Sequence, residues 1–288
     1  MNTKNQSLPD PASRSTAAGN LDAFTLIELA VVIAIIGLLA VMLLPALAGT
    51  KGRACAANDI SNIKQTMTGM LMYCNENSET LPNPGWMGGG YPWVDTWAAS
   101  AGIGAILGAH TVASYQKDYD KQASYFCGKG YGTAPALAPP GSSYAPGAQL
   151  FQYLKNPNIL ICPQDTIMNA AHFARPEIIT SYVWNGAVVA YQNGQVPFKI
   201  SRFKPTNILQ WENADNGNWS DFSNAPVDYD QNGNLIYSFS TRHGKVALVG
   251  RMDGSAGRES MQNMKMWALD TTTKNDLWCS PVSSNNGH

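Results

Sequence analysis

The segment DYDQNGN contains side chains that could bind a metal ion. Asp228, Asp230 and Asn232 stand at the first, third and fifth positions of a calcium-binding loop, and Gly233 stands at the sixth. The twelfth position, where such a loop has a bidentate Glu, is Phe239. The same residues suit an Asn-Gly turn between two strands. Two interpretations follow, a calcium site that uses Asp228, Asp230 and Asn232, and a hairpin without metal.

A second candidate pair is His243 and Asp253 in the segment RHGKVALVGRMDGSA. A His and an Asp can share a proton as a catalytic dyad. However, MDGS is typical of a turn and KVALV of a buried strand, so the pair can equally belong to a hairpin. The sequence has no GxSxG, HExxH, phosphate-binding loop or paired carboxylates. We therefore expect no catalytic residues and no enzyme activity.

The five cysteines form no metal-binding or redox motif, because the sequence has neither a CxxC pair nor a His at zinc-ligand spacing. Disulfide bonds are the other use of cysteine. Cys55 and Cys74 would lie about 28 Å apart along one helix, which is too far for a disulfide. Cys55 is then a small apolar residue of the helix surface. Three pairings stay open among Cys74, Cys127, Cys162 and Cys279.

Charge and composition exclude one class of partner. The chain of 288 residues has 19 basic and 20 acidic residues and a formal net charge of −1, without the basic stripe that nucleic acid requires. Hydrophobic residues make up 44% of the chain, which is enough to fill a core. We expect a folded protein that does not bind nucleic acid.

The elements that must position these groups begin with an apolar run. From Leu29 to Thr50, 22 residues carry no charge, close to the roughly 20 that span a membrane as a helix. Glu28 lies at its start, and a carboxylate in a bilayer costs a few kcal/mol, so Glu28 is a functional candidate. In the simpler alternative, Glu28 reaches the membrane interface. An ordinary secretory signal cut after Ala48 is a further alternative, but the run is too long for one.

Beyond this run the pattern predicts an α+β fold with an antiparallel sheet. Apolar residues at steps of three and four from Ile60 to Cys74 predict that the helix continues to about Asn77. Long loops with a short helix near 98–107 follow, and then a short helix, a turn and a buried strand that ends at Cys162. Further strands are predicted at Ile178–Trp184, Ile208–Trp211, Leu235–Ser240 and Val246–Val249.

The stretch AFTLIELAVVIAIIGLLA resembles the N-terminus of type IV prepilins and type II secretion pseudopilins. The resemblance implies a leader of residues 1–23, cleavage between Ala23 and Phe24 by a prepilin peptidase, and N-methylation of Phe24. This chain has Ala23 where the family usually has Gly. The family's Glu corresponds to Glu28, which would pair with the Phe24 amine of a neighbouring subunit or of its own and set the assembly register.

The resemblance also covers two helix-weakening residues. Gly37 and Pro45 lie where pilin-like helices carry such residues, and proline removes a backbone hydrogen bond, so we expect a kink or a melted turn at Pro45. Related major pseudopilins hold calcium in a C-terminal loop. That property keeps the calcium interpretation of the DYDQNGN segment open.

The second half of the chain is similar to a branch of pilin-like proteins with a His, nine residues and Asp-Gly, here His243, Asp253 and Gly254. ILICPQD, TSYVWNG and RFKPTNILQWENAD also have the order and character of this branch. The implied protein is pilin-like, with residues 24–50 as membrane and assembly helix, 51–77 as amphipathic helix and 78–288 as an α+β domain with long loops.

The function implied is that of a structural subunit of a type IV pilus-like or type II secretion pseudopilus filament. Its partners would be other subunits, the prepilin peptidase and the bacterial cytoplasmic membrane, crossed once with the C-terminal domain outside the cytoplasm. The alternative from another class is a membrane-anchored or secreted carbohydrate-binding protein. Its sugar-stacking surface would come from Trp86, Trp93, Trp97, Trp211 and Trp219.

Overall fold

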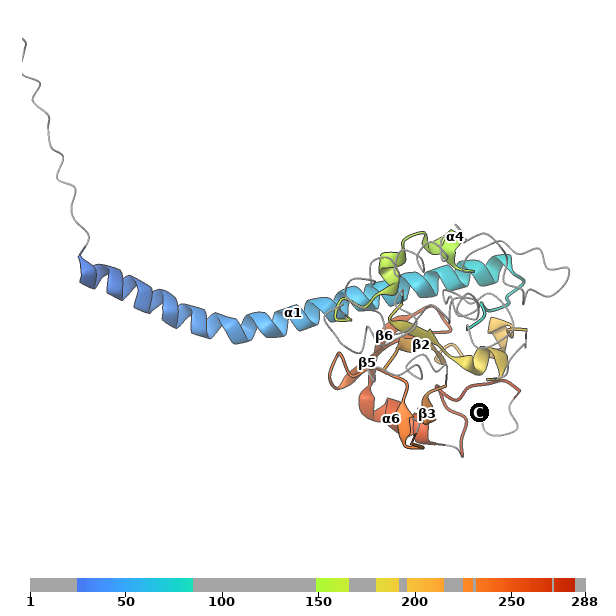
Figure 1. Ribbon diagram of the computed structural model, residues 1–288. Coiled ribbons are helices and arrows are strands. Elements are labelled where there is room, and N and C mark those ends of the chain that lie inside the picture. Colours follow the sequence, from blue (N-terminus) through green and yellow to red (C-terminus); the bar gives the residue numbers. More distant parts are fainter. Residues whose placement is uncertain are drawn as a thin grey trace, which may run out of the picture. The chain divides into compact units, whose positions relative to one another are not determined.

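The computed structural model describes residues 25–84, 149–165, 180–191, 196–214, 225–229, 232–270 and 272–282 (Figure 1). The chain divides into two compact units, Met1–Gly49 and Thr50–His288. The described part of the first unit consists of helix. The second unit contains further helix and all the described strands, which makes it an α+β unit as the sequence predicts.

The N-terminal helix α1 spans Leu26–Glu76. The backbone is helical through Gly37 and Pro45, so the turn at Pro45 is not melted. The helix ends where Ser78 and Glu79 adopt positive φ values of 54° and 65°, and the Glu79 amide donates to the Cys74 carbonyl. Left-handed residues commonly end helices in this way. The end predicted near Asn77 is confirmed.

Four antiparallel strands form the main sheet, in the order β1-β2-β5-β6. β5 and β6 form a hairpin, and β2 joins them to β1. A two-stranded sheet, β3 with β4, accompanies it. The antiparallel arrangement confirms the prediction. The strands are β1 Tyr182–Trp184, β2 Ile208–Glu212, β3 Val227–Tyr229, β4 Leu235–Tyr237, β5 Val246–Arg251 and β6 Ala256–Ser260.

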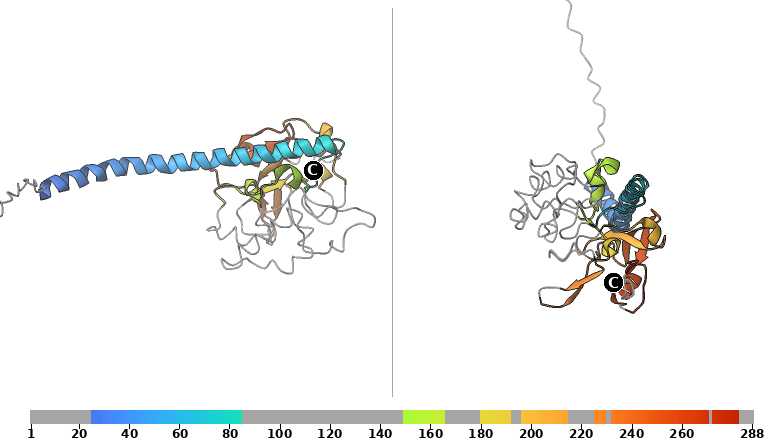
Figure 2. Two further views of the ribbon diagram at one scale, coloured as in Figure 1. Left: turned by 90° about the horizontal axis from the view of Figure 1, so that it is seen from above. Right: turned by 90° about the vertical axis from the view of Figure 1, so that its right-hand side faces the viewer.

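The main sheet buries one apolar cluster on each face. The part of α1 that follows Gly49 runs along the sheet (Figures 1 and 2) and contributes Ile63, Met67, Met70 and Cys74 to the first cluster. Helix α6, Met261–Leu269, contributes to the second cluster on the opposite face. Side chains of a strand alternate between faces, so Trp184 belongs to the first cluster and Val183 to the second.

The short elements depart from the sequence prediction in several places. Helix α4, Phe151–Leu154, is the predicted short helix. The predicted strand that ends at Cys162 is wrong, because Pro157–Leu160 forms the 3-10 helix η1, whose start is capped by the Asn156 side chain. The sequence also missed β3, β6 and α6, while the helix predicted near 98–107 lies outside the described residues. Two further 3-10 turns are η2, Gly186–Val189, and η3, Ile200–Arg202.

Candidate functional site

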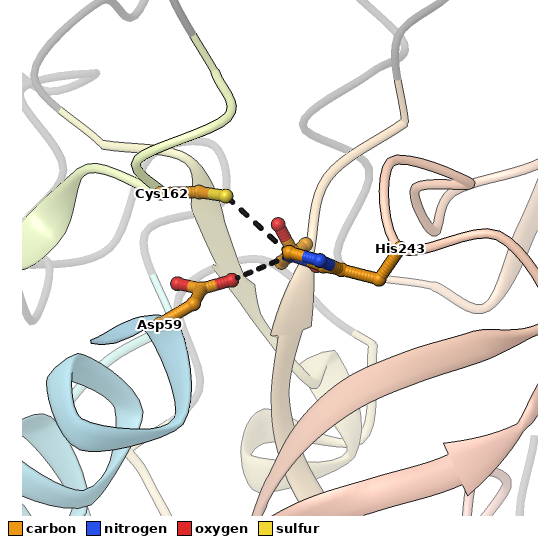
Figure 3. A group of neighbouring side chains, drawn as sticks. Asp59, Cys162 and His243 are labelled. Carbon is orange, nitrogen blue, oxygen red and sulfur yellow. Dashed lines mark hydrogen bonds and ion pairs between the residues drawn. The ribbon is translucent and has the colours of Figure 1, made fainter. Parts of the chain in front are cut away.

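Four side chains with metal-binding atoms meet inside the second unit: Asp59, Cys162, Glu212 and His243, called here the buried cluster. Asp59 comes from α1, Cys162 from the segment after η1 and His243 from the turn before β5 (Figure 3). Glu212 is the last residue of β2. One potential ligand atom from each residue lies within 4.8 Å of all the others.

The cluster is centred on one ring nitrogen, His243 Nε2. This atom lies 3.1 Å from Asp59 Oδ2, 3.3 Å from Glu212 Oε2 and 3.6 Å from Cys162 Sγ. The side chains of His243, Asp59 and Glu212 are 3% exposed or less, so water does not compete for these contacts. A protonated ring nitrogen carries one hydrogen and therefore cannot satisfy three acceptors at once.

Sheet register brings part of this group together. Tyr182 of β1 stands opposite Glu212 of β2, so both side chains leave the same face of the sheet. That face packs against α1, where the Tyr182 hydroxyl donates a hydrogen bond to Asp59 Oδ1. The pairing of β1 with β2 therefore aligns Glu212 with the helical carboxylate.

Arg242 and Asp165 lie beside the buried cluster and add further charges. Arg242 Nη1 lies 3.6 Å from Asp165 Oδ2 and 3.7 Å from Glu212 Oε1, and both side chains of each pair are almost fully buried. Arg242 Nη2 also donates to the backbone and side-chain oxygens of Asn213. Ser181 Oγ donates to Asp165 and accepts from the Cys162 amide. These contacts hold the walls of the cluster in place.

Burial and charge shift the pKa values in the cluster. Burial alone lowers the pKa of His243, but hydrogen bonds to Asp59 and Glu212 outweigh it and raise the pKa to about 9. Burial raises the pKa of Glu212, and the hydrogen bond to His243 opposes that shift. Burial, with the nearby Glu212 and Asp59 charges, also raises the pKa of the Cys162 thiol. Without metal, the cluster therefore holds a His243 cation and a neutral thiol.

The four sequence segments that resemble the pilin-like branch converge on this cluster. ILICPQD supplies Cys162 and TSYVWNG supplies Tyr182, while RFKPTNILQWENAD and RHGKVALVGRMDGSA supply Glu212 and His243. The sequence has no metal-binding spacing among its cysteines and histidines, and the fold nevertheless brings these four donors together. Spacing rules detect ligands that are close in sequence, whereas 81 residues separate Cys162 from His243 and 184 separate Asp59 from His243.

The other half of the His-Asp-Gly motif lies elsewhere. His243 precedes the six-residue strand β5 and Asp253 follows it, so roughly 20 Å of extended chain separates them and no dyad forms. Asp253 Oδ1 accepts from the Ser255 amide, and Gly254 has a φ of 81° in the β5–β6 turn. Lys64 of α1 donates to the Gly254 carbonyl. The hairpin interpretation of Asp253 and Gly254 is confirmed.

The predicted calcium segment forms a hairpin. Asp228 lies in β3, Asn232 is exposed in the following turn, and Gly233 has a φ of 79°. Phe239, at the loop's twelfth position, is buried in the second apolar cluster. Asp230 lies outside the described residues. The Asn-Gly hairpin is thus confirmed, and calcium at Asp228, Asp230 and Asn232 stays a prediction.

The N-terminal candidates lie on or before α1. Ala23 and Phe24 lie outside the described residues. Glu28 Oε2 accepts from the Thr25 amide at 2.9 Å and the Thr25 hydroxyl at 2.7 Å, and the Glu28 amide donates to Thr25 Oγ1 at 3.3 Å. This reciprocal pair is a capping box, which the T-x-x-E spacing could have predicted. Gly37 is exposed on the helix, with no atom within 4 Å of an added Cβ.

The segment Leu26–Leu43 of α1 is long and apolar enough to span a membrane. All of its side chains are exposed in the structure. Glu28 is the one ionisable side chain among them.

The described cysteines form no disulfide bond with one another. Cys55, Cys74, Cys162 and Cys279 are free thiols, and Cys127 lies outside the described residues. Trp211 is fully buried in β2, so its predicted place in a sugar-stacking surface is wrong. The other tryptophans assigned to that surface, Trp86, Trp93, Trp97 and Trp219, lie outside the described residues.

The chemistry available to the buried cluster follows from its burial. Its side chains are buried and their donor atoms lie together, and carboxylates, thiolates and imidazoles are all ligands of transition metals. Comparison with family models, with curated proteins and with solved structures finds no match for this chain.

Proposed function

We propose that the chain is a structural subunit of a type IV pilus-like or type II secretion pseudopilus filament, held in the bacterial cytoplasmic membrane before assembly. The observation that carries the proposal is the exposed apolar surface of Leu26–Leu43. Such a surface is unstable in water and has to be covered by lipid or by apolar helices of other chains. A filament made of these helices satisfies the second condition.

Glu28 gives the assembly its register. The capping box fixes the carboxylate against the backbone amide of Thr25, the residue that follows Phe24. In a mature chain that begins at Phe24, the carboxylate lies beside the new terminal amine, and a positively charged amine offsets the cost of a carboxylate among apolar helices. Ionic pairing between neighbouring subunits then favours one axial offset over the others.

The resemblance of residues 23–40 to prepilins and pseudopilins supports the remaining parts of the proposal. The chain crosses the membrane once, and the α+β unit lies outside the cytoplasm. A prepilin peptidase cleaves after Ala23 and Phe24 is N-methylated. The protein works by assembly and does not turn over a substrate, so other pilin or pseudopilin subunits are its principal partners.

The test separates the charge of Glu28 from its capping role. Glu28→Gln keeps the capping box, because Gln can also accept from the Thr25 amide, but it removes the negative charge. Thr25→Val is the matched control, since it weakens the cap and keeps the charge. We expect Glu28→Gln to lose filament incorporation, measured in sheared surface or cross-linked membrane fractions, while Thr25→Val keeps most of it. Both variants should stay in the membrane fraction.

Intact mass of the membrane-extracted protein checks the processing step. The proposal requires a chain that begins at methylated Phe24. A chain that begins at Gly49 would instead indicate ordinary secretion and would overturn the proposal. Equal incorporation of the wild type and Glu28→Gln would leave the filament possible but contradict the register.

A further inference from the structure

We propose that the buried cluster is a structural zinc site, with His243 Nε2, Cys162 Sγ, Asp59 Oδ2 and Glu212 Oε2 as the four ligand atoms. Zinc is bound by Cys, His and carboxylate ligands, and its structural sites are four-coordinate and leave no open position. The cluster has this number and these kinds of donors, and its side chains are buried. The inference concerns the second unit and does not depend on filament assembly.

The three distances from His243 Nε2 to the other ligand atoms agree with a tetrahedral zinc centre, and all four ligand atoms lie within 4.8 Å of one another. Zn–N and Zn–O bonds of about 2.0 Å at tetrahedral angles place nitrogen and oxygen ligands about 3.3 Å apart, and a Zn–S bond of about 2.3 Å places nitrogen and sulfur about 3.5 Å apart. The corresponding distances here are 3.1 and 3.3 Å for the two carboxylate oxygens and 3.6 Å for the sulfur. Figure 3 shows Asp59 and Cys162 directed at the same edge of the His243 ring.

Atoms around the ligands support the same assignment. Asp59 Oδ1 accepts from the Tyr182 hydroxyl and leaves Oδ2 for the metal. Glu212 Oε1 faces Arg242 and leaves Oε2. The backbone amide of Gln164 donates a hydrogen bond to Cys162 Sγ at 3.4 Å. Hydrogen bonds from the residues around the ligands orient the ligand side chains of metal sites and tune their affinity for the metal.

The kinds of ligand atom in the cluster favour zinc over calcium and magnesium. Calcium takes six to eight oxygen ligands and magnesium six, whereas a thiolate and an imidazole suit zinc. A thiol and an imidazolium bind zinc only after they lose a proton, so zinc binding at Cys162 Sγ and His243 Nε2 should grow stronger as the pH rises.

The experiment uses the full-length chain, extracted in detergent and purified through a tag without histidines. Metal content is measured by mass spectrometry, and the metal-free protein is titrated with Co²⁺. The matched pair is Cys162→Ser and Cys55→Ser, because Cys55 is a free thiol of the same helix as Asp59 and lies outside the cluster. A second pair is Glu212→Gln and Glu259→Gln, the latter in strand β6.

We expect about one zinc per chain in the wild type, Cys55→Ser and Glu259→Gln, and at least about tenfold weaker binding in Cys162→Ser and Glu212→Gln. The cobalt form of the wild type should show a thiolate-to-cobalt charge-transfer band that Cys162→Ser lacks. A wild type without zinc and without that band would overturn the proposal, even if the variants fail to fold. Equal zinc in Cys162→Ser and Cys55→Ser would overturn it as well.

Discussion

At the scale of single residues, Asn185 joins three separate segments of the second unit. Its Nδ2 donates to the carbonyls of Ile208 and Leu277, at 2.9 and 2.8 Å. Its Oδ1 accepts from the Ala187 amide at 3.0 Å and the Tyr191 hydroxyl at 2.8 Å. This fully buried amide thus uses both donor hydrogens and its acceptor oxygen, and the four partners fix which atom is nitrogen.

Asn185→Asp changes one atom and tests that network. The new oxygen would face two carbonyl oxygens in a site without water, so two acceptors lose their donor and a buried charge is added or protonated. We expect the free energy of unfolding to fall by roughly 3 kcal/mol or more. For a unit of this size the thermal midpoint should drop by roughly 6 to 12 °C, measured by circular dichroism.

The control is Asn158→Asp in η1, the same substitution at an exposed position. We expect its midpoint to stay within about 2 °C of the wild type, because surface substitutions change stability by roughly half a kcal/mol or less. Equal midpoints for the two variants would show that the Asn185 contacts do not contribute to stability.

At the scale of elements, α1 serves two different surroundings. Its first part is apolar on all sides, whereas its part in the second unit has a buried face and an exposed face. Met67 is fully buried on that face and contacts β5, because an added Cβ at Gly250 would lie 2.6 Å from the Met67 sulfur. Met72, five residues later, is 49% exposed.

This contrast predicts unequal effects of the same substitution. Met67→Ala should lower the free energy of unfolding by about 2 to 5 kcal/mol, because it leaves a cavity between helix and sheet. Met72→Ala should change it by roughly half a kcal/mol or less. Urea unfolding followed by tryptophan fluorescence compares the two, since Trp184 and Trp211 are both buried. A Met72→Ala effect as large as that of Met67→Ala would contradict the packing.

Helix α1 is an example of the elements that the sequence could predict. Local periodicity predicted the helix through Cys74 and the strands β2 and β5, because each pattern lies within one element. Strand β6, with the sequence AGRES, has no apolar alternation, so no local pattern predicts it. Its structure is determined by its pairing with β5. The buried cluster was missed for a related reason. Its donors become neighbours only through the pairing of Tyr182 with Glu212 and the packing of α1 on that face.

At the scale of the whole molecule, both apolar clusters belong to the second unit. The first residue of either cluster along the chain is Ala56, and the first donor of the buried cluster is Asp59. Among the side chains that the structure describes before Gly49, those of residues 25–43, none belongs to either cluster. The stability of the second unit should come from its own residues.

A chain that begins at Thr50 tests this division. We expect it to be soluble without detergent and to unfold cooperatively, with a thermal midpoint within about 4 °C of the full-length protein, because it keeps every described residue of both clusters. A chain that begins at Leu71 is the control: it also lacks the apolar segment, but it loses Ile63, Met67 and Met70 from the first cluster. At about 2 to 5 kcal/mol for each core residue, the loss is about 6 to 15 kcal/mol, as large as the roughly 5 to 15 kcal/mol by which a domain is stable, so no cooperative transition should appear. Failure of the Thr50 chain to fold would mean that residues before it stabilise the second unit, and that α1 is a single structural element throughout its length.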